Sequence, residues 1–160
     1  MAKAPDYTVI RDTREREGYH FSKFDKCLGM VVRKLDTGDY TLVGLEDKIC
    51  IERKGCVEEV AINFGKKKKQ FLAEIERMKE FPHRFILLEF TLEDLMKFPQ
   101  DTRIPNKSSV KITGKYILRT LMEFQVHDDV HVVFCGDKNS AFLYANSLFK
   151  RINSKYERKQ

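Results

Sequence analysis

The 160-residue chain, 42% of it hydrophobic, is long enough for one well-filled core and too short for two ordinary domains. Its formal net charge of +6 is compatible with binding a polyanion, but it is also compatible with a basic protein that binds none. The longest apolar run, "FILLEF", is far shorter than the roughly 20 residues that cross a bilayer, and the N-terminus has no apolar signal core, so membrane insertion and secretion are disfavoured.

Strands dominate the first third of the chain. "YTVI" predicts a first strand, and the polar "DTREREG" after it predicts a loop. Ser22 is a candidate N-cap for a short helix that ends near Gly29. "MVVRKL" predicts a second strand, which the turn "DTGD" follows. The runs "YTLVGL" and "KICIERK" flank residues 46–47 and together predict a hairpin.

Helices and strands alternate in the rest of the chain. Apolar residues at helical spacing predict a helix from about Lys67 to Phe81. "RFILLEF" then predicts a buried strand, "TLEDLMKF" a short helix, and "PQDTRIPNKSSVKITG" a polar, basic loop. "KYILRTLMEFQ" predicts a helix, "VHVVFCG" a strand, and "NSAFLYANSLFKRI" a last helix. This alternation indicates an α/β fold, with several strands in one sheet and helices over it.

The predicted hairpin brings three charged side chains together. Alternate side chains of a strand share a face, so Glu52 and Lys54 emerge side by side. Asp39 stands at the outer end of the partner strand, close enough to place its carboxylate beside Glu52. Two carboxylates suit a hard divalent cation such as Mg²⁺, which leaves room for water and for a substrate phosphate. A solvated salt bridge at a strand end is the alternative explanation of the same pattern.

Three motifs, "VIRDTRE", "GDYTLVG" and "ICIERKG", resemble in order and spacing the signature of the XPF/Hef family of structure-specific DNA endonucleases. "QFLAEIERM", "RFILLEF" and the C-terminal helices and strand extend the resemblance over nearly the whole chain. It implies an α/β fold with a restriction-endonuclease-like central mixed sheet flanked by helices. It also implies a compact XPF-type nuclease domain over residues 1–152, with a basic C-terminal tail over residues 153–160.

The resemblance implies a metal-dependent endonuclease that hydrolyses DNA phosphodiester bonds with Mg²⁺ or Mn²⁺ and needs no small-molecule cofactor. By the family's pattern, the metal ligands are Asp39, Glu52 and the backbone carbonyl of Arg53. Lys54 is then the group that positions or deprotonates the attacking water. A bound cation lowers the pKa of its water and neutralises charge as the phosphorane forms, which supports these roles.

The rim of the family's site has acids and a basic residue suited to phosphate, and Asp12, Glu15 and Arg14 match them here. The chain departs from the pattern at two places. Many relatives have an aspartate four residues beyond the motif lysine, where this chain has Glu58. Relatives often place an arginine at the start of the next helix, where this chain has residues 69–70, "KQ". The resemblance therefore implies that a lysine is the candidate for the phosphate contact there.

Basic stretches supply the other candidate DNA contacts, alongside Arg14. The first lies near a predicted helix start and consists of Lys66, Lys67, Lys68 and Lys69. A bound phosphate offsets cations that oppose the helix dipole, although a solvated lysine face explains this run equally well. The second lies in the later polar loop and the helix after it, and consists of Lys107, Lys111 and Lys115 with Arg103 and Arg119. Such residues grip backbone phosphates without reading sequence.

Several expectations concern the setting of the protein. The four cysteines have neither a Cys-x-x-Cys pair nor zinc-like spacing, which indicates reduced thiols in an intracellular compartment. That compartment is a bacterial cytoplasm for a bacterial or virus-encoded protein, or a nucleus in a eukaryote. Relatives pair through their nuclease domains, so a homodimer is expected. Its candidate contacts, which core packing explains as well, are Leu118, Leu121, Phe142 and Phe149. The expected substrates are branched or otherwise structured DNA in repair, recombination or replication. A catalytically silent DNA-binding or scaffold subunit is the alternative, and an RNA-directed nuclease is a third.

Overall fold

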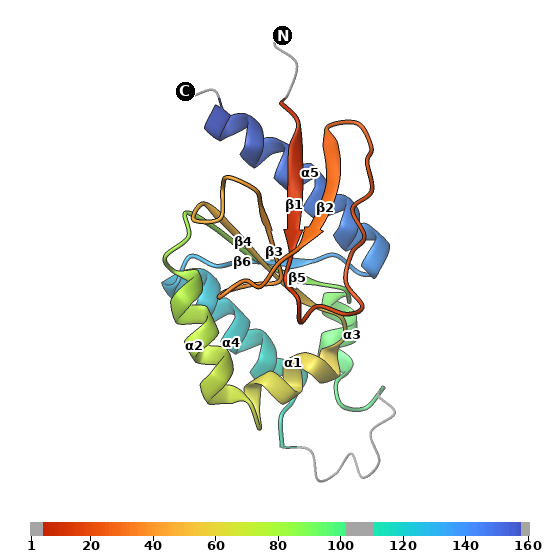
Figure 1. Ribbon diagram of the computed structural model, residues 1–160. Helices are drawn as coiled ribbons and strands as arrows, with labels where there is room; N and C mark the ends of the chain where they lie inside the picture. The colour runs from red at the N-terminus through yellow and green to blue at the C-terminus, as the bar shows by residue number, and fades with distance from the viewer. Residues whose placement is uncertain (1–4, 102–110, 158–160) are drawn as a thin grey trace.

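The computed structural model describes residues 5–101 and 111–157, in which a mixed six-stranded sheet lies between two layers of helices (Figure 1). The strand order is β2–β1–β3–β4–β5–β6. The strands are β1 (Tyr7–Arg11), β2 (Cys27–Val32), β3 (Tyr40–Leu42), β4 (Ile49–Lys54), β5 (His83–Leu88) and β6 (His131–Phe134). β3 pairs antiparallel with β1 and β4, and the other neighbours are parallel. The expected α/β fold with a central mixed sheet flanked by helices is confirmed.

Each face of the sheet has its own hydrophobic core. One face is covered by α1 (Val57–Phe64), α2 (Lys68–Met78), α3 (Leu92–Lys97) and α4 (Gly114–His127), and the other by α5 (Lys138–Glu157). Along β4, Cys50 belongs to the first core, whereas Ile49 and Ile51 belong to the second. The alternation continues to the end of the strand. Glu52 and Lys54 therefore extend toward α1 and α2, and Arg53 toward α5.

The predicted hairpin is present, and its register places Asp39 at the end of β4. Tyr40 of β3 lies opposite Ile51 of β4. The backbone N–H of Asp39 donates to the carbonyl of Ile51 at 2.8 Å. Asp39 therefore lies next to Glu52, as the hairpin geometry predicted.

The prediction of a short helix after Ser22 is wrong. The residues before β2 form a tight turn in which Phe24 and Cys27 exchange two backbone hydrogen bonds, of 3.0 and 2.9 Å. Asp25 adopts a φ of 51° within it, which is incompatible with an α-helix. β2 then begins at Cys27, three residues earlier than the expected strand.

Helix α1 was not predicted, although the sequence carries its signal. Val57, Val60 and Phe64 recur at helical spacing and are buried. α2 begins one residue later than expected and ends at Met78, short of the predicted residue 81. At the C-terminus, α5 continues to Glu157, so residues 153–157 of the expected tail are helical.

Two further findings concern membrane spans and the cysteines. In the described part of the chain, no helix is both long enough and apolar enough to span a membrane. All four cysteines are free thiols.

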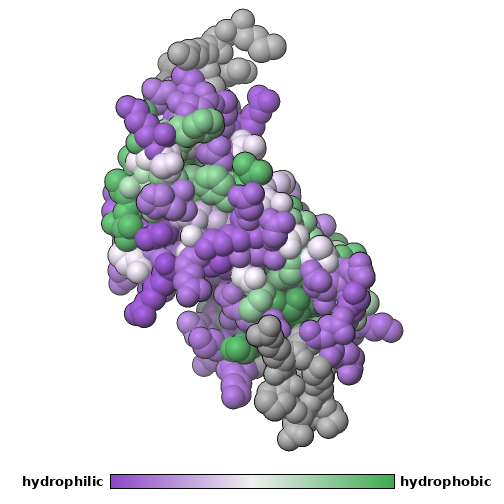
Figure 2. All heavy atoms as spheres, turned by 90° about the vertical axis from the view of Figure 1, so that its right-hand side faces the viewer, coloured by the Kyte–Doolittle hydropathy of each residue, from purple (hydrophilic) through white to green (hydrophobic). Residues whose placement is uncertain are grey.

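Of the candidate dimer residues, Leu121 and Phe149 are fully buried, and Leu118 and Phe142 pack against the two cores. Figure 2 shows a face on which small hydrophobic groups alternate with hydrophilic side chains.

Candidate active site

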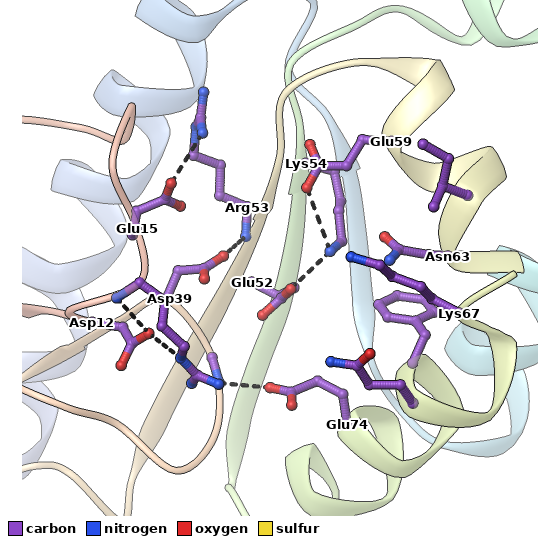
Figure 3. A pocket seen from close by; sticks show the side chains of 15 residues that line it. Asp12, Glu15, Asp39, Glu52, Arg53, Lys54, Glu59, Asn63, Lys67 and Glu74 are labelled. Carbon is purple, nitrogen blue, oxygen red and sulfur yellow. Dashed lines mark hydrogen bonds and ion pairs between the residues drawn. The ribbon is translucent and has the colours of Figure 1, made fainter.

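A cleft of about 360 Å³ opens at the C-terminal end of β4, between the hairpin and the helices α1 and α2 (Figure 3). All seven residues that the sequence assigned to catalysis line it: Asp12, Arg14, Glu15, Asp39, Glu52, Arg53 and Lys54. The opposite wall consists of side chains from α1, α2 and the turn between them: Glu59, Ile62, Asn63, Lys67, Gln70, Phe71 and Glu74. Both walls of the cleft thus carry acidic and basic side chains together, with acids in slight excess.

The carboxylate of Asp39 is oriented by the strand beside it. Its Oδ2 accepts a hydrogen bond from the backbone N–H of Arg53 at 2.7 Å. Burial, followed by the charges of Glu52 and Glu15, raises the pKa of Asp39 well above its usual range, and the bond from Arg53 only partly opposes this. Asp39 is therefore a carboxylate whose negative charge lacks full compensation from the protein.

Glu52 and Lys54 form a buried ion pair on the same face of β4. The Nζ of Lys54 lies 2.8 Å from Oε1 of Glu52, and the two residues are 5% and 8% exposed. Lys54 Nζ also lies 3.7 Å from Glu59 and 4.9 Å from the centre of the Phe71 ring. Burial alone lowers the pKa of Lys54, but the charge and hydrogen bond of Glu52 outweigh it and leave the pKa raised. Lys54 is therefore an ammonium in this arrangement.

Asp39 and Glu52 fit a hard divalent cation. Burial raises the pKa of Glu52 too, and the charges of Glu74 and Glu59 add to this effect while Lys54 opposes it. A cation relieves such desolvation and repulsion. Among the described residues, no three side chains of the His, Cys, Asp and Glu types are close enough to hold a metal together. A divalent cation held by these two carboxylates would need a backbone carbonyl, water or substrate oxygens to complete its coordination, a donor set that suits Mg²⁺.

The side chain of Arg53 points to the other face of β4 and is held by Glu89, which was not predicted. Two hydrogen bonds, of 2.5 and 2.9 Å, join its guanidinium to the Glu89 carboxylate, and Glu15 lies 3.4 Å away. The backbone N–H of Glu89 also donates to the carbonyl of Lys54 at 2.9 Å. The available signal in the sequence was that Glu89, a charged residue, directly follows a buried strand. Its place beside Arg53 follows from the parallel pairing of β4 and β5.

Asp12 holds the rim of the cleft together. Only 1% exposed, it accepts hydrogen bonds from the backbone N–H of Leu35 at 2.7 Å and from the Nε of Arg14 at 2.7 Å. Burial raises the pKa of Asp12, but these bonds outweigh that effect and lower it. The side chain of Arg14, by contrast, is 65% exposed. Asp12 thus ties the loop after β1 to the segment before the Asp39 turn.

The opposite wall holds residues that the sequence did not assign to the site. The carboxylate of Glu59 lies 3.7 Å from the Nζ of Lys54, and it accepts a hydrogen bond from the backbone N–H of Gly55 at 2.9 Å. The side-chain amide oxygen of Asn63, Oδ1, is buried and has no hydrogen-bond partner within the described residues. Both positions depend on the rotation of α1, the helix that was not predicted.

The predicted DNA-binding lysines are placed differently from one another. Lys66, Lys67, Lys68 and Lys69 are all exposed, but only Lys67 lines the cleft. Lys68 donates to the hydroxyl of Tyr116 at 3.2 Å instead. Lys111 and Lys115 are exposed, whereas Lys107 and Arg103 lie outside the described residues.

Comparisons with known proteins give the family and the fold of the chain. A family model described as "ERCC4 domain" matches residues 11–148. XPF from Aeropyrum pernix is similar in structure, with a TM-score of 0.61 and 17% sequence identity over 89% of this chain and 60% of that one. A second structure, XPF from Aeropyrum pernix in complex with DNA, also gives 0.61 and 17%, over 96% and 66%. The chain thus spans 60% to 66% of the length of these relatives. Among curated proteins no match is found.

Proposed function

We propose, from the premise that this chain belongs to the ERCC4-domain family of nucleases, that it is a metal-dependent DNA endonuclease that hydrolyses phosphodiester bonds. The observation that carries the proposal is the convergence of Asp39, Glu52 and Lys54 in one cleft. The similarity to XPF from Aeropyrum pernix in complex with DNA supports DNA as the substrate.

Each of these side chains has a role in hydrolysis. Asp39 and Glu52 hold Mg²⁺ or Mn²⁺, with the carbonyl of Arg53 as a further ligand. When bound, such a cation lowers the pKa of a coordinated water and neutralises charge at the phosphorus. Lys54, as an ammonium, orients the attacking water and offsets the charge that develops on the phosphoryl oxygens. The bond from Arg53 to Asp39 keeps that carboxylate in place without a metal.

The rival function is a catalytically silent DNA-binding or scaffold subunit. Such a subunit has no need of two desolvated carboxylates with raised pKa values, because their desolvation destabilises the fold. The retention of Asp39, Glu52 and Lys54 in one cleft therefore favours catalysis.

The remaining parts of the proposal concern substrate shape, assembly and setting. We infer that the preferred substrate is branched or otherwise structured DNA. We also infer that the nuclease domain forms a homodimer and works in a reducing intracellular compartment. The four free thiols are consistent with that compartment. With Leu121 and Phe149 inside the cores, a dimer must use other apolar side chains of the surface.

The test incubates the purified chain with linear duplex, single-stranded, flap, fork and four-way-junction DNA, and with single-stranded RNA, each with and without Mg²⁺ or Mn²⁺. We expect metal-dependent cuts in DNA, fastest on branched forms, and none with Asp39→Ala. DNA binding without cleavage in every arm supports the scaffold subunit, and cleavage of RNA alone supports an RNA-directed nuclease.

A further inference from the structure

The side chain of Glu74 reaches from the middle of α2 to the turn that carries Asp39. Its Oε1 accepts a hydrogen bond from the backbone N–H of Gly38 at 2.7 Å, and its Oε2 pairs with Arg77. Only 18% of the Glu74 side chain is exposed. Figure 3 shows it pointing from its helix across the cleft, toward the side that holds Asp39.

The turn that Glu74 contacts is tightly constrained. Gly38 has a φ of 78°, in the left-handed region that favours glycine. A Cβ there would lie 2.5 Å from the Sγ of Cys50 and 3.1 Å from the carbonyl oxygen of Ile51. β4 thus holds the turn from one side, and Glu74 holds it from the other, one residue before the Asp39 carboxylate.

Glu74 is poorly placed to be a metal ligand itself. Both of its oxygens already have partners, one on the backbone and one on Arg77. Within the described residues, it does not complete a three-carboxylate metal site with Asp39 and Glu52. The contact with Gly38 requires only an acceptor oxygen at this position, which an amide supplies as well as a carboxylate does.

We propose that Glu74 is a positioning residue, which sets the Gly38–Asp39 turn through its hydrogen bond to the Gly38 N–H and not through its charge. The inference rests on the proposed function, because the turn matters there as the support of a metal-binding carboxylate. α2 also carries Gln70 to the opposite wall of the cleft. The same contact therefore fixes that wall relative to Asp39.

The experiment compares Glu74→Gln, which keeps the acceptor, with Glu74→Ala, which removes it. Glu76→Ala is the matched control, since Glu76 lies on the same helix, is 69% exposed and pairs with Lys79. We expect Glu74→Ala to lower kcat about 10- to 100-fold, the usual cost of losing a group that supports a metal ligand, and to raise the Mg²⁺ concentration for half-maximal cleavage. KM for DNA stays unchanged, and Glu74→Gln and Glu76→Ala retain most of the wild-type rate.

Two outcomes overturn the inference. In the first, Glu74→Gln is as impaired as Glu74→Ala, which assigns the effect to charge. In the second, Glu74→Ala is as active as the wild type. If Glu74→Ala does not fold, Glu74→Met, which keeps the length and lacks the acceptor, takes its place. Hydrogen exchange of the Gly38 amide is a readout independent of cleavage. Protection in wild type and Glu74→Gln, with fast exchange in Glu74→Ala, supports the contact even if the wild type cuts no DNA, in which case the proposed function alone fails. Equal exchange rates in all three overturn the contact.

Discussion

The backbone N–H of Arg53 donates to the carboxylate of Asp39 at 2.7 Å, so the strand that carries Glu52 also orients the partner acid. The bond joins two positions that are 14 residues apart in the chain. It forms because β3 and β4 pair antiparallel with Tyr40 opposite Ile51. The hairpin therefore sets the geometry of both proposed metal-binding carboxylates.

Asp39→Asn removes the charge of this carboxylate and keeps an oxygen acceptor for Arg53. We expect cleavage to fall by more than the roughly 10- to 100-fold that loss of an outer contact costs. The free energy of unfolding stays equal or rises, because a half-buried carboxylate that Glu52 and Glu15 repel is replaced by a neutral amide. Cleavage rates at saturating Mg²⁺ and thermal unfolding measure the two effects. Asp47→Asn, in the exposed hairpin turn, is the control, and unchanged cleavage by Asp39→Asn contradicts the assignment.

The carboxylates of the hairpin are the part of the site that sequence could predict. A strand places alternate residues on one face, so Glu52 and Lys54 had to emerge together once β4 was recognised. The predicted turn before β3 then placed Asp39 at the start of the partner strand. These are short-range relations, and the structure keeps all of them.

The wall formed by α1 and α2 could not be predicted in the same way. α1 itself was readable from its apolar spacing, but which of its acids faces Lys54 depends on the rotation of the helix. Glu74 reaches Gly38 across 36 positions, and Glu89 reaches Arg53 across the same number. Such contacts are set by tertiary packing, so no local pattern specifies them.

Lys54→Met tests the buried ion pair. Removal of the ammonium leaves Glu52 buried without its counter-charge, so we expect a loss of about 3–5 kcal/mol of unfolding free energy. The double variant Glu52→Gln/Lys54→Met removes both charges and recovers most of this loss. Urea unfolding of the wild type, both single variants and the double variant forms a complete cycle. A double variant no more stable than Lys54→Met contradicts the coupling.

The metal requirement should weaken as pH rises. The pKa values of Asp39 and Glu52 are raised, so at mildly acidic pH a larger fraction of these groups is protonated than of ordinary carboxylates. Protons then compete with the cation for the same oxygens. We expect the Mg²⁺ concentration for half-maximal cleavage to fall as pH rises from the acid side and to level off once both groups are ionised. A metal requirement independent of pH over that range contradicts the assignment.

Asp12→Asn, followed by urea unfolding, tests the structural role of Asp12. Loss of the charged acceptor for Leu35 and Arg14 should cost about 1–3 kcal/mol of unfolding free energy. The pKa of Asp12 is lower in the folded state than in the unfolded chain, so its stabilisation is complete above an unfolded pKa of about 3.9 and is lost as pH falls through the folded value. The stability difference between wild type and Asp12→Asn is therefore constant from neutral pH to about pH 5 and narrows below about pH 4. Equal stability at neutral pH contradicts the structural role.

Lys67 should contribute more to DNA binding than its neighbours in the lysine run. Of the cationic side chains that line the cleft, Arg14, Arg53 and Lys54 each engage a carboxylate, whereas Lys67 forms no ion pair within the described residues. Its ammonium is therefore free to meet a DNA phosphate. We expect Lys67→Ala to weaken DNA binding and to reduce the slope of log K against log salt by about 0.9 for duplex DNA, the value for one lost phosphate contact. Lys69→Ala removes the same charge outside the cleft and should leave the slope near that of the wild type. Equal slopes for the two variants, measured by fluorescence anisotropy without metal, would mean that the run acts only as a diffuse positive surface.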